Sequence, residues 1–173
     1  MRCFISINIP KQVAREIKKI QDKLPEFSGK KTELENFHLT LKFLSQIDED
    51  KVEEVKKKLN EIKFEKFESE IDLIGVFSEK FIRIIWLHLA NCDNLQKIVD
   101  EKLKDLFEPE RRFMSHLTIA RVKNIKDKKK FLEELKKVKI PKIKFNVNSF
   151  YLMKSELTSD GPRYEVIEEY FLV

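Results

Sequence analysis

Two copies of one short motif, H-L-T followed by a branched apolar residue, constrain this chain more than any other feature of its sequence. They are His38-Leu39-Thr40-Leu41 and His116-Leu117-Thr118-Ile119. Phe4 precedes the first copy by almost as many residues as Phe81 precedes the second. This spacing predicts an internal repeat: two lobes of comparable architecture, related by an approximate twofold axis, each presenting one H-x-T strand to a shared cleft.

Hydrophobic periodicity predicts the same order of elements around each motif: a strand, a helix, a loop, the motif strand, a second helix and a further strand. In the first half these segments are residues 2–9, 13–24, 26–36, 38–44, 48–62 and 69–77. In the second half they are residues 81–89, 93–106, 109–112, 116–121, 127–138 and 142–153, with a last strand at 164–172. We therefore predict an α+β fold with two pseudo-symmetric lobes, each an antiparallel sheet with flanking helices, in one domain over residues 1–173.

The composition is that of an ordinary globular domain. With 42% hydrophobic residues over 173 positions, the chain can bury a substantial core without disulfides or metal. Cys3 and Cys92 lie far apart, and neither belongs to a C-x-x-C or Cys/His cluster. No signal peptide is recognisable, and the longest apolar run, residues 81–90, is interrupted by Arg83 and is too short to span a bilayer. We expect a cytoplasmic, monomeric protein that does not contact membranes.

The charge balance gives a mild indication of the partner. Lys and Arg number 35 against 30 Asp and Glu, which leaves a net charge of +5 and a pI near 9.0. A surplus of this sign favours a polyanion such as RNA without proving one.

The alternation of side chains along a strand divides each motif between two faces. His38 and Thr40 are predicted to face the cleft, while Leu39 and Leu41 face the core. The second motif has the same pattern, so His116 and Thr118 are predicted to face the same cleft.

Two charged residues follow the motifs on the same strands. Lys42 shares the predicted cleft face with His38, so it could steer a phosphate, and a solvated lysine near a strand end is the alternative. Strict alternation from His116 turns Arg121 to the core face, away from the cleft, unless the strand bends or ends at Ala120. The Arg121 guanidinium would nevertheless suit bidentate phosphate binding.

Two imidazoles that face one substrate can divide acid and base duties near neutral pH, because each has an ordinary pKa of about 6.5. Phosphodiester chemistry needs a base for the attacking oxygen and an acid for the departing one. The Thr40 and Thr118 hydroxyls can donate hydrogen bonds to phosphate oxygens, where charge concentrates in the transition state. The pattern indicates phosphate chemistry catalysed by two histidines.

Other chemistries find less support in the sequence. No carboxylate flanks either motif in ligand spacing, so we expect neither a metal nor another cofactor. No serine or cysteine stands in a recognisable nucleophile turn. The third histidine, His88, lacks the accompanying threonine and is interpreted as a packed or surface residue.

The whole chain resembles the RNA 2′,3′-cyclic phosphodiesterase family, historically called 2′-5′ RNA ligases, within the two-histidine phosphoesterase superfamily. The resemblance includes both ends, where the chain reads Arg2-Cys3-Phe4-Ile5-Ser6-Ile7 and Leu152, Ser155, Leu157, Gly161, Pro162 and Tyr164. It also includes both motif strands, the second continuing to Arg121, which the family places at the active site. Ser45 departs from the pattern, because the family usually has glycine after the first motif strand.

The resemblance implies an activity and a role for each histidine. His38 would be the proton donor and His116 the proton acceptor in metal-independent hydrolysis of RNA 2′,3′-cyclic phosphate ends to 2′-phosphomonoesters. Family members can also run the reaction backwards, joining such an end to a 5′-hydroxyl as a 2′-5′ linkage without ATP. The implied partner is RNA with a 2′,3′-cyclic phosphate end, with tRNA fragments as one candidate.

Two alternatives remain open at this point. A non-catalytic RNA-binding module would use the basic surface alone, but it has no need for paired imidazoles. A phosphodiesterase acting on small cyclic nucleotides, or on an ADP-ribose cyclic phosphate, would keep both histidines and change only the substrate.

Overall fold

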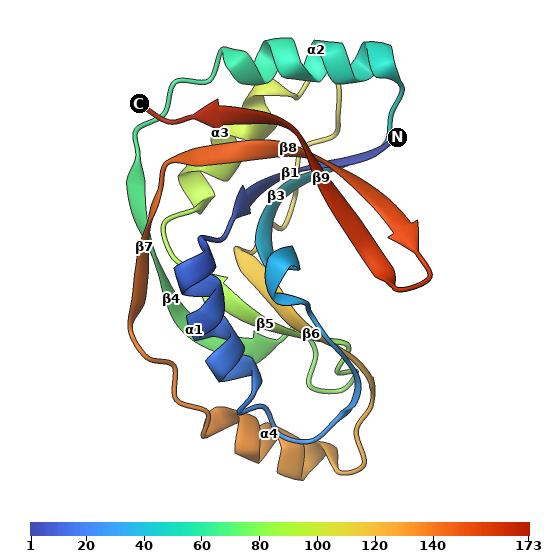
Figure 1. Ribbon diagram of the computed structural model, residues 1–173, viewed down its shortest axis with the longest axis vertical. Coiled ribbons are helices and arrows are strands. Elements are labelled where there is room, and N and C mark those ends of the chain that lie inside the picture. Colours follow the sequence, from blue (N-terminus) through green and yellow to red (C-terminus); the bar gives the residue numbers. More distant parts are fainter.

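One curled, antiparallel sheet forms the centre of the protein. The computed structural model describes residues 1–173, with strands in the order β7-β4-β5-β6-β3-β1-β8-β9 and β2 paired to β6 (Figure 1). The strands are β1 Arg2–Asn8, β2 Ser28–Lys31, β3 His38–Gln46, β4 Phe67–Val76, β5 Ile84–Leu89, β6 His116–Asn124, β7 Ile143–Val147, β8 Ser149–Thr158 and β9 Gly161–Phe171. The helices are α1 Lys11–Gln21, α2 Glu49–Asn60, α3 Asp93–Lys102 and α4 Lys128–Lys136, with a 3-10 turn, η1, at Leu34–Asn36.

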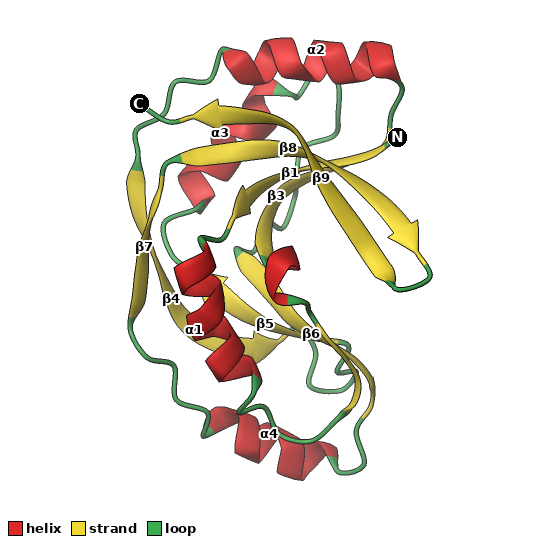
Figure 2. Ribbon diagram, in the orientation of Figure 1, coloured by secondary structure: helices red, strands yellow, loops and turns green.

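The two motif strands, β3 and β6, meet in the middle of this sheet. Their ladder pairs one residue from each strand, Leu39 and Leu117. Outward from this contact, β3 is followed by β1, β8 and β9, and β6 is followed by β5, β4 and β7. Helices accompany both halves (Figure 2). The predicted α+β fold with two lobes is confirmed, and the lobes share one continuous sheet.

The strand predicted over residues 81–89 begins at Ile84 and the helix predicted over 93–106 ends at Lys102, and two other segments differ in the elements that they form. The strand predicted over residues 142–153 is interrupted at Asn148 and forms two strands: β7, which pairs with β4 in one lobe, and β8, which pairs with β1 and β9 in the other. Periodicity cannot reveal this crossing, because both strands carry buried side chains. The loop predicted over residues 26–36 contains β2, whose side chains are all exposed and therefore leave no apolar pattern.

The helices form where apolar side chains recur every three or four residues. α1 buries Val13, Ile17 and Ile20 on one face. α2 begins after Asp48, whose carboxylate accepts a hydrogen bond from the Lys51 N–H at 2.8 Å, as an N-cap should. The apolar side chains that the helices bury belong to a single hydrophobic cluster with residues from both lobes. None of the helices combines the length and apolar composition that crossing a bilayer requires.

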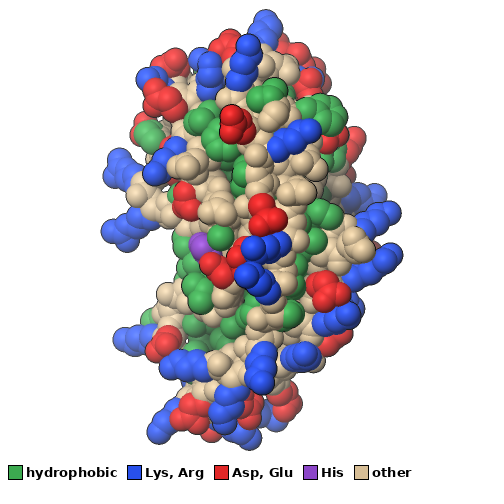
Figure 3. Space-filling view, turned by 90° about the vertical axis from the view of Figure 1, so that its left-hand side faces the viewer, with side chains coloured by type: hydrophobic (Ala, Val, Ile, Leu, Met, Phe, Trp, Pro, Cys, Tyr) green, Lys and Arg blue, Asp and Glu red, His purple; other side chains and the backbone are tan.

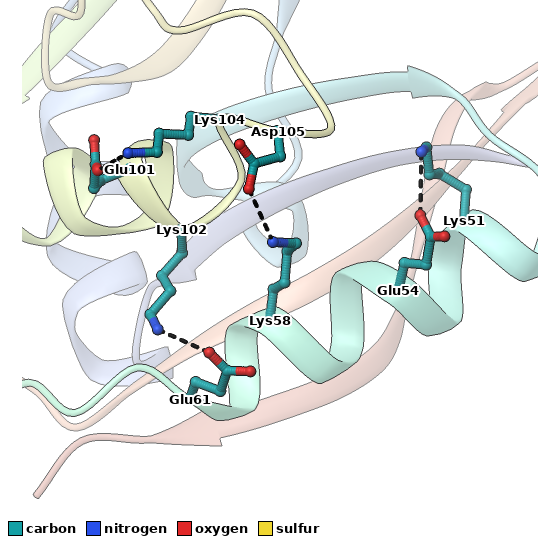
Figure 4. A network of polar contacts seen from close by, with 8 residues as sticks. All are labelled: Lys51, Glu54, Lys58, Glu61, Glu101, Lys102, Lys104 and Asp105. Carbon is teal, nitrogen blue, oxygen red and sulfur yellow. Dashed lines mark hydrogen bonds and ion pairs between the residues drawn. The ribbon is translucent and has the colours of Figure 1, made fainter.

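Exposed ion pairs connect α2 and the residue after it with α3 and the turn that follows α3 (Figure 4). Lys102 lies 2.9 Å from Glu61, and Lys58 lies 3.5 Å from Asp105. Each exposed pair stabilises a fold by at most about 1 kcal/mol. Apolar burial therefore holds these helices more strongly than the ion pairs do.

A β-bulge interrupts each motif strand at the same distance from its histidine. In β3, Thr40 and Lys42 pair with consecutive residues of β1, which leaves Leu41 as the extra residue. In β6, Thr118 and Ala120 pair with consecutive residues of β5, which leaves Ile119 as the extra residue. Because a bulge adds one residue to a strand, it reverses the faces occupied by the side chains directly after it.

The bulge in β3 overturns the predicted position of Lys42. This side chain lies on the core side, 2% exposed, where its ammonium donates hydrogen bonds to the Asp100 carboxylate and to the Glu108 carbonyl, the latter at 2.8 Å. Asp100 also accepts a hydrogen bond from the Glu110 N–H at 2.9 Å. Lys42 therefore fastens the loop that leads into the second motif strand, and it does not line the cleft.

Four residues have positive φ: Gly29, Ser45, Asn91 and Gly161. Ser45, where the family that the chain resembles usually has glycine, has a φ of 60°, a conformation that favours glycine. Gly29 in β2 has a φ of 156°, and a Cβ atom there would lie 2.2 Å from the Arg121 carbonyl oxygen. The close approach of β2 to β6 therefore depends on glycine at this position.

Substituting Lys42 alone should be strongly destabilising, because it leaves the Asp100 carboxylate largely buried without its cation. We expect Lys42→Met to lower the free energy of unfolding by about 3 kcal/mol. The double variant Lys42→Met/Asp100→Leu should recover part of the loss, since it removes both charges. Urea denaturation measures the unfolding free energy of both variants. A Lys42→Met variant as stable as the wild type would contradict a stabilising ion pair between Lys42 and Asp100.

Gly29→Ala should detach β2 from β6, because the new methyl group overlaps the Arg121 carbonyl. The expected loss is about 1–3 kcal/mol of unfolding free energy, with faster amide hydrogen exchange in residues 28–31. The comparison variant is Gly161→Ala, at the other glycine with positive φ. Amide hydrogen exchange in residues 28–31 should be slower in Gly161→Ala than in Gly29→Ala, because the atom nearest to the new Cβ is the flexible end of the Lys30 side chain.

Candidate active site

A cleft of about 840 Å³ opens where β3 and β6 meet. Its lining includes both motif histidines and both motif threonines: His38, Thr40, His116 and Thr118. An antiparallel pair centred on Leu39 and Leu117 sets each histidine across from the threonine of the other strand. The structure thus brings together the four residues that the motifs predict.

Each motif histidine is held by the backbone just before its strand. His38 Nδ1 donates a hydrogen bond to the Asn36 carbonyl at 2.8 Å, and His116 Nδ1 donates one to the Met114 carbonyl at 2.7 Å. Because a carbonyl oxygen can only accept, Nδ1 must carry the proton in both rings. Each Nε2 is therefore the atom that gains or loses a proton, and His38 Nε2 lies 3.1 Å from Thr40 Oγ1.

Aromatic rings restrict both imidazoles. The Tyr164 ring from β9 contacts His38 edge to face at 5.0 Å between centroids, and Phe4 from β1 contacts it at 5.0 Å. Phe77, which follows β4, contacts His116 edge to face at 4.9 Å. Each lobe thus covers its own histidine with a ring from a neighbouring strand or strand end.

Burial lowers the pKa of His38 below its ordinary value. Loss of solvent is the main cause, and the hydrogen bond to the Asn36 carbonyl opposes it. The Arg121 charge, and any positive charge on His116, act in the same direction as loss of solvent. His38 is therefore neutral at a lower pH than an exposed histidine, and its protonated form is a stronger acid.

Arg121 lines the cleft, contrary to what strict alternation predicts. The bulge at Ile119 reverses the face of the later residues, so Ala120 is buried and Arg121 is exposed. Phe43 occupies the matching position after the bulge in β3, lines the same cleft and is 61% exposed. The two lobes thus present a cation and an aromatic ring at equivalent positions.

The two H-x-T motifs do not predict three of the residues that line the cleft. Tyr164 comes from the hairpin β8–β9, and Lys30 and Lys31 come from β2. A second hollow of about 580 Å³ continues past Tyr164 and His38 toward Arg163 and Asp160. Only the resemblance at the chain end singled out Tyr164, and nothing in the sequence marks β2.

His88 lies outside this group. It pairs across the ladder with His116, but its Nδ1 binds the Asp72 carboxylate at 2.6 Å, and it is not among the residues that line the cleft. No group of three or more His, Cys, Asp or Glu stands close enough together to hold a metal ion.

The chain is similar to known phosphoesterases over nearly its full length. The family model described as LigT like Phosphoesterase matches residues 7–86 and 89–164. The RNA 2′,3′-cyclic phosphodiesterase of Methanocaldococcus jannaschii is 40% identical, covering 98% of this chain and 100% of the relative. The protein of the same name from Thermotoga maritima is 35% identical over 98% of this chain and 94% of the relative.

Solved structures share the fold. The crystal structure of TT0787 from Thermus thermophilus has a TM-score of 0.83 at 23% identity, covering 99% of this chain and 98% of that one. Escherichia coli LigT complexed with 3′-AMP has a TM-score of 0.80 at 21% identity, covering 99% of this chain and 97% of that one. With two histidines and two threonines around one cleft, this chain belongs to the family of LigT-like phosphoesterases and is a hydrolase of that class.

Proposed function

We propose that this chain is one two-lobed phosphoesterase domain, residues 1–173, that hydrolyses RNA 2′,3′-cyclic phosphate ends to 2′-phosphomonoesters. The observation that carries the proposal is the pair of imidazoles that line one cleft, each with its Nδ1 fixed by a backbone carbonyl, which leaves Nε2 as the ring nitrogen for proton transfer. His38 Nε2 lies beside the Thr40 hydroxyl. The names of the relatives from M. jannaschii and T. maritima support the substrate class.

The reaction divides between the two rings. His116 Nε2 takes a proton from water as the water oxygen attacks phosphorus, and the bond from phosphorus to the ribose 3′-oxygen breaks. His38 Nε2 gives its proton to that departing oxygen, which leaves a 2′-phosphate and a 3′-hydroxyl. The stronger acidity of protonated His38 suits this donor role, and a bound phosphate anion offsets the lowered pKa by favouring the charged ring.

Hydrogen-bond donors around the cleft stabilise the charge that develops on phosphorus oxygens. Thr40 and Thr118 each offer a hydroxyl, and Arg121 offers a planar guanidinium. These groups assume the role that a metal has in other phosphoesterases, so the proposed reaction needs no metal. Lys42 has no part in it.

The same groups can join two RNA ends when a 5′-hydroxyl takes the place of water: His116 Nε2 takes the proton of the attacking hydroxyl, and His38 Nε2 again protonates the departing 3′-oxygen. Joining a 2′,3′-cyclic phosphate end to a 5′-hydroxyl would then yield a 2′-5′ linkage without ATP. We propose a cytoplasmic monomer whose substrates are RNA ends of this kind, with tRNA fragments among them.

Activity should depend on both motif histidines and persist in EDTA. Incubation of an oligoribonucleotide ending in a 2′,3′-cyclic phosphate should yield the 2′-phosphate, and His38→Ala and His116→Ala should each reduce kcat by about 10²–10⁴-fold. Phosphorus NMR identifies the product. The matched control is His88→Ala, which removes a histidine outside the cleft and should retain wild-type kcat. A cyclic end that persists with the wild-type protein would defeat the proposal.

The pH dependence should contain the lowered pKa of His38. Acid–base catalysis needs a protonated donor and a neutral acceptor, so kcat/KM should be bell-shaped, with the pKa of His38 setting one limb. Tyr164→Ala exposes the His38 ring to water, which favours its charged form, so the pKa of His38 and the limb that it sets should both move to higher pH.

Histidine NMR titration measures the pKa directly, and initial rates give the limb. Phe77→Ala is the control, because that ring contacts His116 and should leave the pKa of His38 in place. If Tyr164→Ala raised the pKa of His38 in the NMR titration and moved neither limb of the profile, proton transfer by His38 would be contradicted.

A further inference from the structure

The positive charge of this protein is concentrated in one stretch that begins at the active site. Residues 121–130 contain six Lys or Arg and one Asp, so they account for the whole net charge of +5. All six cationic side chains are exposed. Elsewhere the signs balance, and on the face drawn in Figure 3 Lys and Arg are interspersed with Asp and Glu.

The internal repeat shows that the fold does not require this charge. Residues 43–52 stand equally far from the first motif histidine, and they contain one Lys against three acidic residues. α2 begins with Glu49 and Asp50 in its first turn, whereas α4 begins with three lysines and no acidic residue. Cations there oppose the helix dipole, so helix stability does not explain them.

This stretch leads out of the cleft. Arg121 lines the cleft, and β6 continues from it through Lys123 to Asn124, a path of about 10 Å. The chain then turns past Lys126 into α4, which lies at the opposite end of the molecule from α2 (Figure 1). Exposed β2 runs beside β6 along the same path and adds Lys31.

An exposed aromatic ring lies next to the charged stretch. Phe81 is 62% exposed, with Lys80 Nζ at 5.7 Å and Lys128 Nζ at 5.8 Å from its ring centroid. Lys128 also donates a hydrogen bond to the Lys80 carbonyl at 2.6 Å, which ties the turn to α4. Ile84, three residues further along, lines the cleft. An aromatic face between cations is the combination that binds single-stranded nucleic acid without sequence preference.

We propose that the RNA strand preceding the terminal nucleotide leaves the cleft over this surface, with phosphates on Lys123, Lys126 and Lys129 and a base stacked on Phe81. The inference rests on the proposed function and adds the path of the RNA, which runs along the lobe that carries β6 and α4. It makes RNA, rather than a mononucleotide, the preferred substrate. The acidic stretch at the equivalent place in the other lobe would repel the strand.

Comparison of two substrates tests this path. One is 2′,3′-cyclic AMP, which ends inside the cleft, and the other is an oligoadenylate with a 2′,3′-cyclic phosphate end, which extends beyond it. The test variants are Phe81→Ala and Lys126→Glu/Lys129→Glu. The control is Lys57→Glu/Lys63→Glu, which reverses two exposed lysines on and just after α2, at the other end of the molecule.

Wild-type KM should be lower for the oligoadenylate than for the mononucleotide at low salt. Phe81→Ala should raise the oligoadenylate KM by about tenfold. Lys126→Glu/Lys129→Glu should also raise this KM, and it should reduce the slope of log KM against log salt concentration by about 1 or more. Neither should change kinetics on 2′,3′-cyclic AMP, and the control should change neither substrate. Unchanged oligoadenylate KM, or equal losses on both substrates, would overturn the proposal.

Binding measurements separate this proposal from the proposed reaction. Fluorescence anisotropy of a labelled oligoadenylate with a 3′-phosphate reports the surface even without turnover. If the wild type hydrolysed neither substrate, the proposed reaction would fail, and weaker binding by the two test variants would still support the RNA path. If hydrolysis proceeded and binding were unchanged in those variants, only the RNA path would fail.

Discussion

The pairing of Leu39 with Leu117 is the contact on which the candidate active site depends, because it joins the two motif strands at the centre of the sheet. Each lobe alone would offer one imidazole to solvent. The antiparallel contact brings the two strands together so that the histidine of one lies across from the threonine of the other. The placement of both histidines at one cleft is therefore a property of the junction between the lobes.

The two bulges then decide which side chains reach that junction. Extra residues at Leu41 and Ile119 reverse the strand faces, so Lys42 enters the core and Arg121 enters the cleft. Simple alternation gives the opposite result for both. The burial patterns of β3 and β6 are identical from the histidine to the strand end, so the two motif strands share the bulge as well as the motif.

Approximate symmetry in the backbone coexists with asymmetry in the side chains. Equivalent positions after the bulges hold Phe43 and Arg121, and the segments that follow differ in the sign of their charge. Under the proposed function, two different walls suit a terminal cyclic phosphate better than two equal ones, because this substrate has a base on one side and the reacting oxygens on the other. The charge difference also supports the proposed path of the RNA strand out of the cleft.

The sequence by itself determined the α+β class, the order of most elements and the four motif residues, because local periodicity records which face of a strand or helix is buried. It did not determine the bulges, the position of β2 or the crossing at Asn148, since these depend on pairing between residues far apart in the chain. Tertiary structure alone decided that Arg121 faces the cleft and that Lys42 does not. It also set the lowered pKa of His38, because burial among Phe4 and Tyr164 exists only once the strands are assembled.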